Sequence, residues 1–257
     1  MSIFQTLILS VVEGITEFLP ISSTGHLILV SKLLDLSQTE FVKSFEIIIQ
    51  LGAIMAIVVL YFKKLIKNKK LYPKILAAFL PSAIIGFVLY KFIKQYLIGD
   101  PRIVLVSLFI GGILLIVLEK ILARIKVKTN LTIDELDLKS CLLIGLSQAI
   151  SMIPGVSRAA ATIIGGMSVG LSRQDAVKFS FLLAVPTMAA ATGLDLIKSY
   201  QYFSAQDIKL LIIGFIVSFI SAKIAVEWLI KFMKNHSLAA FGVYRIVLAI
   251  AFWVFIK

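Results

Sequence analysis

The chain has 257 residues, is 60% hydrophobic and carries a formal net charge of +12. Soluble domains are about 45–50% apolar, so this composition excludes an ordinary water-soluble protein. The charge is no sign of a nucleic-acid partner, because much of it gathers in residues 63–74, as expected for a cytoplasmic loop of a membrane protein.

The first predicted element, residues 3–30, is an apolar segment interrupted by proline, serine and glycine at 19–25. We expect a re-entrant helix–break–helix that enters and leaves the membrane on one side. A single spanning helix with a proline kink is the alternative. Three uninterrupted apolar stretches follow, each about long enough to cross a bilayer: 45–62, 75–90 and 103–118.

A polar stretch at 119–139 is interpreted as a linker, after which the same plan recurs. The segment 141–171 is interrupted at 153–158, and apolar stretches follow at 179–197, 210–230 and 240–256. Pro20-Ile-Ser-Ser lies 134 positions before Pro154-Gly-Val-Ser. This spacing predicts internal repeats of approximately 1–125 and 135–257 within a single integral membrane domain, 1–257.

The predicted fold is an all-α polytopic membrane protein with six spanning helices and two re-entrant segments. Three spans in each half invert the second half relative to the first, so the two breaks should meet near the bilayer midplane. With 63–74 inside, the inner segments carry 15 basic residues and the outer ones 8, which agrees with the positive-inside tendency. Both termini and the first break then open to the outer side.

Two carboxylates precede the first break. Glu13 and Glu17 share a helix face, and carboxylates at membrane depth are costly enough to suggest function. They could hold Mg²⁺ or Ca²⁺ or a proton, or they could form a solvated interfacial face.

Hydroxyl groups fill the first break. They can bind phosphate oxygens, one could act as a nucleophile, or they could cap a helix. His26 follows closely and could serve as general acid or base. The hydroxyl residues are Ser22, Ser23 and Thr24.

The second break combines Gly155, Ser157, Arg158 and Thr162 at the start of an apolar helix. A helix N-terminus attracts anions, and the arginine fork suits phosphate. The alternative is that Arg158 reaches the membrane surface or pairs with a glutamate. If the breaks meet, the assembled groups are suited to phosphoryl transfer.

Other polar residues in the apolar segments receive lesser predicted roles. Supporting positions behind the site are expected for Glu46, Gln50 and Gln148. Glu227 and Arg245 are expected to form a structural pair near the ends of their spans.

Both motifs resemble those of the undecaprenyl-diphosphate phosphatases of the bacitracin-resistance type. They read Glu-Gly-Ile-Thr-Glu-Phe-Leu-Pro-Ile-Ser-Ser-Thr-Gly-His from Glu13 to His26, and Pro-Gly-Val-Ser-Arg from Pro154 to Arg158. The likeness runs along the whole chain. It implies hydrolysis of undecaprenyl diphosphate to undecaprenyl phosphate and inorganic phosphate, which recycles the carrier lipid for cell-wall synthesis.

The resemblance also implies roles for individual residues. Glu13 and Glu17 would bind the divalent cation and take part in catalysis, with Ser23 as nucleophile or phosphate ligand and His26 as acid or base. The phosphate-binding motif would comprise Ser157, Arg158 and Thr162. Ala159 stands where the family pattern commonly has a serine, so that hydroxyl is absent.

The expected setting is the bacterial inner membrane, with the active site facing outward. Expected partners are a polyprenyl diphosphate lipid and membrane lipids, without nucleic acid, and the chain could form a homodimer. The rival function is a lipid or ion transporter or flippase with proton-coupled glutamates, because broken helices in inverted repeats are typical of transporters.

Overall fold

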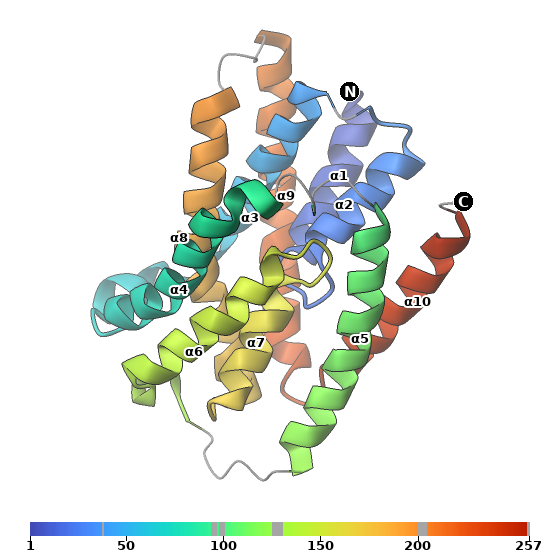
Figure 1. Cartoon of the computed structure of the whole chain (residues 1–257). Helices are drawn as coiled ribbons and strands as arrows, with labels where there is room; N and C mark the ends of the chain where they lie inside the picture. Colours follow the sequence, from blue (N-terminus) through green and yellow to red (C-terminus); the bar gives the residue numbers. More distant parts are fainter. Residues whose placement is uncertain (38, 94–96, 98–100, 125–130, 200–204, 256–257) are drawn as a thin grey trace.

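The computed structural model describes all residues except 38, 94–96, 98–100, 125–130, 200–204 and 256–257. Its described part is a helical bundle without a β-strand (Figure 1). The α-helices are α1 Ile3–Thr16, α2 Ser23–Leu33, α3 Glu40–Lys67, α4 Leu71–Phe92, α5 Pro101–Arg124, α6 Leu138–Ala149, α7 Arg158–Ser168, α8 Arg173–Ser199, α9 Ala205–Phe232 and α10 Ala239–Phe255, with short 3₁₀ turns η2 Ile133–Glu135 and η3 Ile150–Met152.

Within the described ranges, five helices are long and apolar enough to cross a membrane: α3, α4, α5, α8 and α9. Each contains one of the predicted spans. The sixth predicted span, 240–256, becomes the 17-residue α10, and residue 256 lies outside the described residues. At about 1.5 Å per residue, α10 is roughly 26 Å long, slightly less than the roughly 30 Å hydrocarbon core. The prediction of an all-α polytopic membrane protein is confirmed.

Each interrupted segment forms a pair of packed helices rather than one kinked helix. Helix α1 packs beside α2, and α6 packs beside α7. The kinked-span alternative is therefore wrong, because its two halves would lie end to end. The bounds of the breaks also differ from those predicted, since α2 already resumes at Ser23 and α7 at Arg158.

The two breaks share an unusual cap geometry. Ser22 has φ 73° and ψ 95°, Ser157 has φ 78° and ψ 113°, and each side chain accepts a hydrogen bond from the backbone N–H three residues later. Positive φ also recurs just after the two helices, at Asp35 (49°) and Gly170 (102°). The same backbone pattern thus appears 135 positions apart. This pattern supports the predicted repeat. The bounds of the two repeats stay a prediction, and residues 125, 256 and 257 lie outside the described part.

The predicted linker 119–139 is shorter than expected, and its first residue belongs to α5. Glu119 is only 4% exposed. Its carboxylate forms an ion pair with Arg173 and accepts a hydrogen bond from the Leu238 N–H at 3.0 Å. Helix α5 is thereby tied to the starts of α8 and α10. Residues 125–130 of this stretch lie outside the described part.

The remainder of that connection turns into η2 and then α6. Asp137 caps α6 by accepting a hydrogen bond from the Ser140 N–H at 2.8 Å. Hydrogen bonding from the Ser140 side chain, together with this backbone bond, holds the pKa of the Asp137 carboxyl below its ordinary value. The cap explains why α6 begins at Leu138, three residues before the predicted start of its segment.

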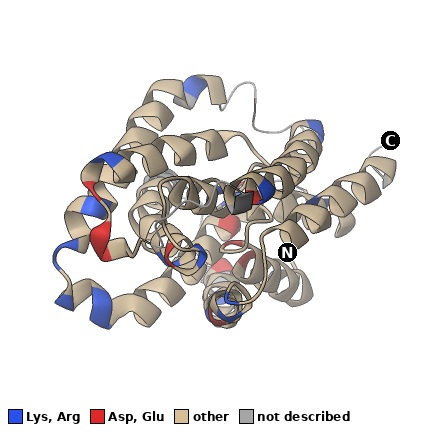
Figure 2. Cartoon of the chain, turned by 90° about the horizontal axis from the view of Figure 1, so that it is seen from below, with Lys and Arg blue, Asp and Glu red and all other residues tan. Residues whose placement is uncertain are grey.

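Basic residues gather at helix ends and in the connections between helices, as Figure 2 shows. The cluster predicted as a loop joins the end of α3 to the start of α4. The start of α1 and the end of α10 both lie above the connection between α9 and α10 in Figure 1. The orientation of the chain in the membrane stays a prediction.

Candidate active site

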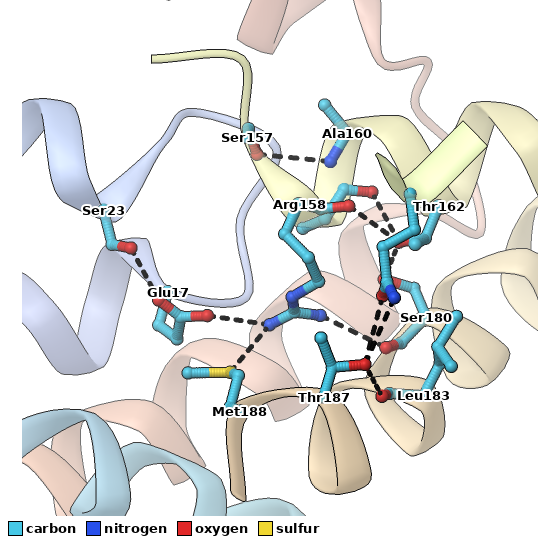
Figure 3. A network of polar contacts seen from close by, with 12 residues as sticks. Glu17, Ser23, Ser157, Arg158, Ala160, Thr162, Ser180, Leu183, Thr187 and Met188 are labelled. Carbon is cyan, nitrogen blue, oxygen red and sulfur yellow. Dashed lines mark hydrogen bonds and ion pairs between the residues drawn. The ribbon is translucent and has the colours of Figure 1, made fainter. Parts of the chain in front are cut away.

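The two breaks are joined by a buried ion pair. Arg158 Nη2, at the start of α7, lies 2.8 Å from Glu17 Oε1, which follows α1 (Figure 3). The side chains are only 12% and 7% exposed. Buried charges require partners of this kind, because each pays a large desolvation cost. The structure therefore brings together the acidic and basic residues that the sequence singled out.

Arg158 is held from several further directions. Its Nη1 donates to the Ser180 carbonyl at 3.2 Å, and its Nη2 lies 3.4 Å from Met188 Sδ. The guanidinium also lies 5.5 Å from the ring centre of Phe18, which packs edge-on against Phe181. The Nε–H has no acceptor among the described residues. The fork is thus fixed in position, and its buried Nε–H is left without a protein acceptor in the described part of the chain.

Ser23 lines the cavity and is hydrogen-bonded to Glu17. Its Oγ donates to Glu17 Oε2 at 2.5 Å, and it is the first residue of α2. A nucleophilic hydroxyl needs an adjacent base, and a carboxylate within hydrogen-bond reach can supply one. Glu17 therefore connects Ser23 on one side with Arg158 on the other (Figure 3).

A cavity of about 200 Å³ lies at this junction. The N-termini of α2 and α7 both reach it, and their free N–H groups and partial positive charge favour an anion. Gly155 is required at its wall: φ is 94°, and a Cβ there would lie 2.6 Å from the Val104 carbonyl oxygen. The predicted residues that line the cavity are Glu17, Ser22, Ser23, Thr24, Gln50, Gly155, Ser157 and Arg158.

Glu13 does not line the cavity and is fully buried on α1. Neither of its carboxylate oxygens has a hydrogen-bond donor within the described part of the chain. A buried, unpartnered carboxylate is expensive, and its hard oxygens suit a divalent cation. No group of three or more His, Cys, Asp or Glu side chains in that part could hold a metal. Any cation would thus depend on Glu13, Glu17 and substrate oxygens.

His26 is not free in this geometry. Its Nδ1 lies 2.8 Å from the Ser22 carbonyl, so it donates there, and its Nε2 accepts from the Tyr244 hydroxyl at 2.8 Å. The ring thereby supports the strained backbone of Ser22 and does not line the cavity. The acid–base role stays a prediction, and Tyr244, from a helix far along the chain, was not foreseen.

Thr162 also lies away from the cavity. It is fully buried, and its Oγ1 donates to the Arg158 carbonyl at 2.9 Å and pairs with Ser180 Oγ at 2.6 Å. These contacts brace the first turn of α7 behind Arg158 and differ from the phosphate contact expected of Thr162.

The residues predicted as support have mixed placements. Gln50 lines the cavity, whereas Glu46 lies outside its lining but close enough to Glu13 to repel its charge. The Gln148 side-chain amide donates to Ser82 Oγ at 2.6 Å and to Thr187 Oγ1 at 3.2 Å.

Arg245 is the main residue whose role was mispredicted. The expected pair with Glu227 is wrong, because Glu227 is exposed and Arg245 is 0% exposed. Its guanidinium donates to carbonyl oxygens of α5 and of both breaks: Val156 and Gly155 at 2.9 Å, Ser107 at 3.0 Å, Leu108 at 3.4 Å and Pro20 at 3.5 Å. An arginine within the apolar 17-residue α10 was the available signal.

The fold defines a polytopic helical membrane protein, with a cavity between two broken segments that is lined by Arg158, Glu17 and the N-termini of α2 and α7. Residues 6–251 match the family model described as bacitracin resistance protein BacA, and the chain belongs to this family. The resemblance noted from the two motifs is confirmed.

Full-length relatives carry the name undecaprenyl-diphosphatase. The protein of Aquifex aeolicus is 53% identical over 255 residues, 99% of each chain. That of a Sulfurihydrogenibium species is 50% identical over 99% of each chain. The Bdellovibrio bacteriovorus protein is 47% identical, over 97% of this chain and 94% of its own.

Proposed function

We propose that the chain is a membrane enzyme that hydrolyses undecaprenyl diphosphate to undecaprenyl phosphate and inorganic phosphate. The observation that carries this proposal is that Glu17 accepts a hydrogen bond from Ser23 and forms an ion pair with Arg158 at a cavity between two helix N-termini. Anion-binding groups, a hydroxyl and a carboxylate base are the parts that phosphoryl transfer needs. The names of relatives that match nearly the whole chain supply the substrate.

The geometry favours attack by Ser23. Its Oγ would bond to the terminal phosphorus while Glu17 Oε2 takes the hydroxyl proton. The bond from that phosphorus to the bridging oxygen breaks, which releases undecaprenyl phosphate. Water then hydrolyses the phosphoserine and frees phosphate. Arg158 and the N–H groups of α2 and α7 stabilise the charge that develops on the phosphoryl oxygens. The alternative, in which Glu17 activates water directly, needs no phosphoserine.

A divalent cation, Mg²⁺ or Ca²⁺, fits Glu13, whose two oxygens lack donors within the described residues. Glu17 and substrate oxygens would complete the ligand set. When bound, the cation would neutralise charge on the diphosphate. It would also relieve the repulsion that Glu17 and Glu46 exert on Glu13.

We also propose the inner membrane as the location, with the cavity open to the outer side. The charge count across the predicted loops supports this orientation. A homodimer stays a prediction.

Phosphate release tests the function directly. Purified protein in detergent, given undecaprenyl diphosphate with Mg²⁺ or Ca²⁺, is expected to release inorganic phosphate. Chelation of the cation should lower the rate, and Glu13→Gln should require more cation for half-maximal rate. A transporter or flippase would bind or move the lipid without releasing phosphate, and that result would reject the enzyme.

A phosphoenzyme distinguishes the two forms of attack. With substrate labelled at the terminal phosphate, acid quenching of a single turnover is expected to trap labelled wild-type protein. Ser23→Ala should trap none and lose about 10²-fold or more in rate. Ser22→Ala is the matched control: it loses a helix cap, costing about 1 kcal/mol, but should still trap label. Label on Ser23→Ala, or none on the wild type, would favour the water mechanism.

A further inference from the structure

A second cavity adjoins the phosphate site, and we propose that it binds the start of the isoprenoid tail of the lipid substrate. This inference rests on the proposed function and assigns the part of the substrate that the phosphate cavity cannot hold. The second cavity has a volume of about 920 Å³, against about 200 Å³ for the first. It lies between α4, η3 and α8 and is called the tail groove below.

The tail groove is continuous with the phosphate cavity. Ser151, Thr187 and Ala191 line both. A molecule whose head group contacts Arg158 can therefore pass its chain directly into the groove. This continuity selects a ligand with an anionic head and a long hydrocarbon chain.

The polar groups of the groove are concentrated where it meets the phosphate cavity. Gln148, Ser82 and Thr187 satisfy one another there, with donor–acceptor distances of 2.6 and 3.2 Å. Beyond them the wall is apolar except for Lys91, which lies near the end of α4. Phe87 and Val88 are 87% and 71% exposed. In a membrane-spanning helix such side chains face lipid, so the groove opens sideways into the hydrocarbon layer. The tail can thus enter without crossing water.

Small side chains make the wall concave. Ala83 and Gly86 on α4 face the groove together with Ala190 and Ala191 on α8. A Cβ at Gly86 would lie 3.0 Å from Met152 Cε, which belongs to the opposite wall. Met152 has an adaptable side chain that can repack around a chain of irregular shape. A larger residue at Ala83 or Gly86 would take up the space of the tail.

The groove predicts that tail recognition can be separated from phosphate chemistry. Rates are compared for undecaprenyl diphosphate and for isopentenyl diphosphate, a head group with only five carbons. Ala83→Phe and Gly86→Leu are expected to raise KM for the long lipid about tenfold or more, because apolar contacts of a few methylene groups suffice for that factor. Their kcat/KM for isopentenyl diphosphate should match wild type.

Ile84→Phe is the matched control, since Ile84 neighbours Ala83 on α4, is 60% exposed and does not line the groove. It should behave as wild type with both substrates. The proposal is overturned if both groove variants keep the wild-type KM for the long lipid. It is also overturned if they lose both substrates equally, which would mean general damage. Two variants keep the test valid if one fails to fold.

Labelling separates this inference from the proposed function. Undecaprenyl diphosphate with a photoreactive group near its first isoprene units is expected to label Met152 or Phe87, even if the wild type releases no phosphate from either substrate. Equal labelling by a photoreactive phosphatidylglycerol would show that bulk lipid fills the groove and would reject the tail site. Absence of phosphate release with intact labelling would reject only the enzyme.

Discussion

Arg158→Ala is expected to lower the rate of phosphate release by about 10²–10³-fold, the usual cost of losing one group that stabilises transition-state charge. The loss should appear in kcat as well as in kcat/KM, because the guanidinium meets most charge when the phosphoryl group is in transfer. Single-turnover assays with undecaprenyl diphosphate measure it. Arg158→Lys, which keeps the charge but not the fork, should recover only a small part.

The ion pair complicates this variant, because removal of Arg158 leaves Glu17 buried without its cation. Breaking a buried pair from one side costs roughly 3–5 kcal/mol of stability. The double variant Glu17→Gln with Arg158→Ala should therefore melt higher than Arg158→Ala alone and stay inactive. Arg173→Ala removes a second arginine–glutamate ion pair, with Glu119, and neither residue lines the cavity. This variant should retain near wild-type kcat. Wild-type rates in Arg158→Ala would remove this residue from the mechanism.

Much of the fold follows from local properties of the sequence. Long apolar stretches dictate helices at membrane depth because unpaired backbone groups cannot be tolerated there. Five of the predicted spans therefore appear as helices that extend beyond their predicted ends. The ends differ because capping residues decide where a helix begins: the Thr39 side chain caps α3, which therefore starts at Glu40 and not at the predicted residue 45. Hydropathy carries no information on such caps.

The charged residues of the site could be predicted from the sequence, because an ionised side chain is costly to place in a membrane segment. Glu17 and Arg158 stand out because an ionised group in an apolar segment needs a reason. The direction in which a side chain points could not be predicted from the motifs. His26 and Thr162 occupy motif positions, yet their hydrogen bonds turn them toward Tyr244 and Ser180. Those partners are 218 and 18 residues away, and no local pattern reveals them.

The tail groove could not be predicted from the sequence, for a related reason. Beyond its polar junction with the phosphate cavity, its wall is built mainly of alanine, glycine and apolar residues of α4, η3 and α8. Such residues look the same in sequence whether they pack against another helix, face lipid or leave a hollow. Only the packing of α4 against η3 and α8 distinguishes these cases.

Arg245→Met is expected to lower the free energy of unfolding by roughly 3–5 kcal/mol and to reduce activity strongly. The methionine preserves apolar bulk but withdraws the donors that the guanidinium supplies to the carbonyls of Gly155 and Val156 in the break. It also removes the additional bond to the Ser107 carbonyl, which lies within α5. Each buried carbonyl left without a donor costs about 1–3 kcal/mol of stability. The total is smaller than the sum of these costs because the surrounding backbone can partly relax. Because these carbonyls belong to the second break and to α5, the variant should also loosen the backbone that positions Arg158.

Thermal melting in detergent and phosphate release together measure this effect. Arg245→Lys should recover part of the stability, since an ammonium offers three donors without the planar fork. Gly111→Ala should act in the same direction as Arg245→Met, because an added Cβ would collide with the guanidinium. Tyr244→Phe, next to it on α10, loses only the hydrogen bond to His26 and should melt much closer to wild type. A wild-type melting temperature and rate for Arg245→Met would show that the breaks hold their shape without it. The ion pair of Glu17 and Arg158 would then have to hold the two breaks together by itself.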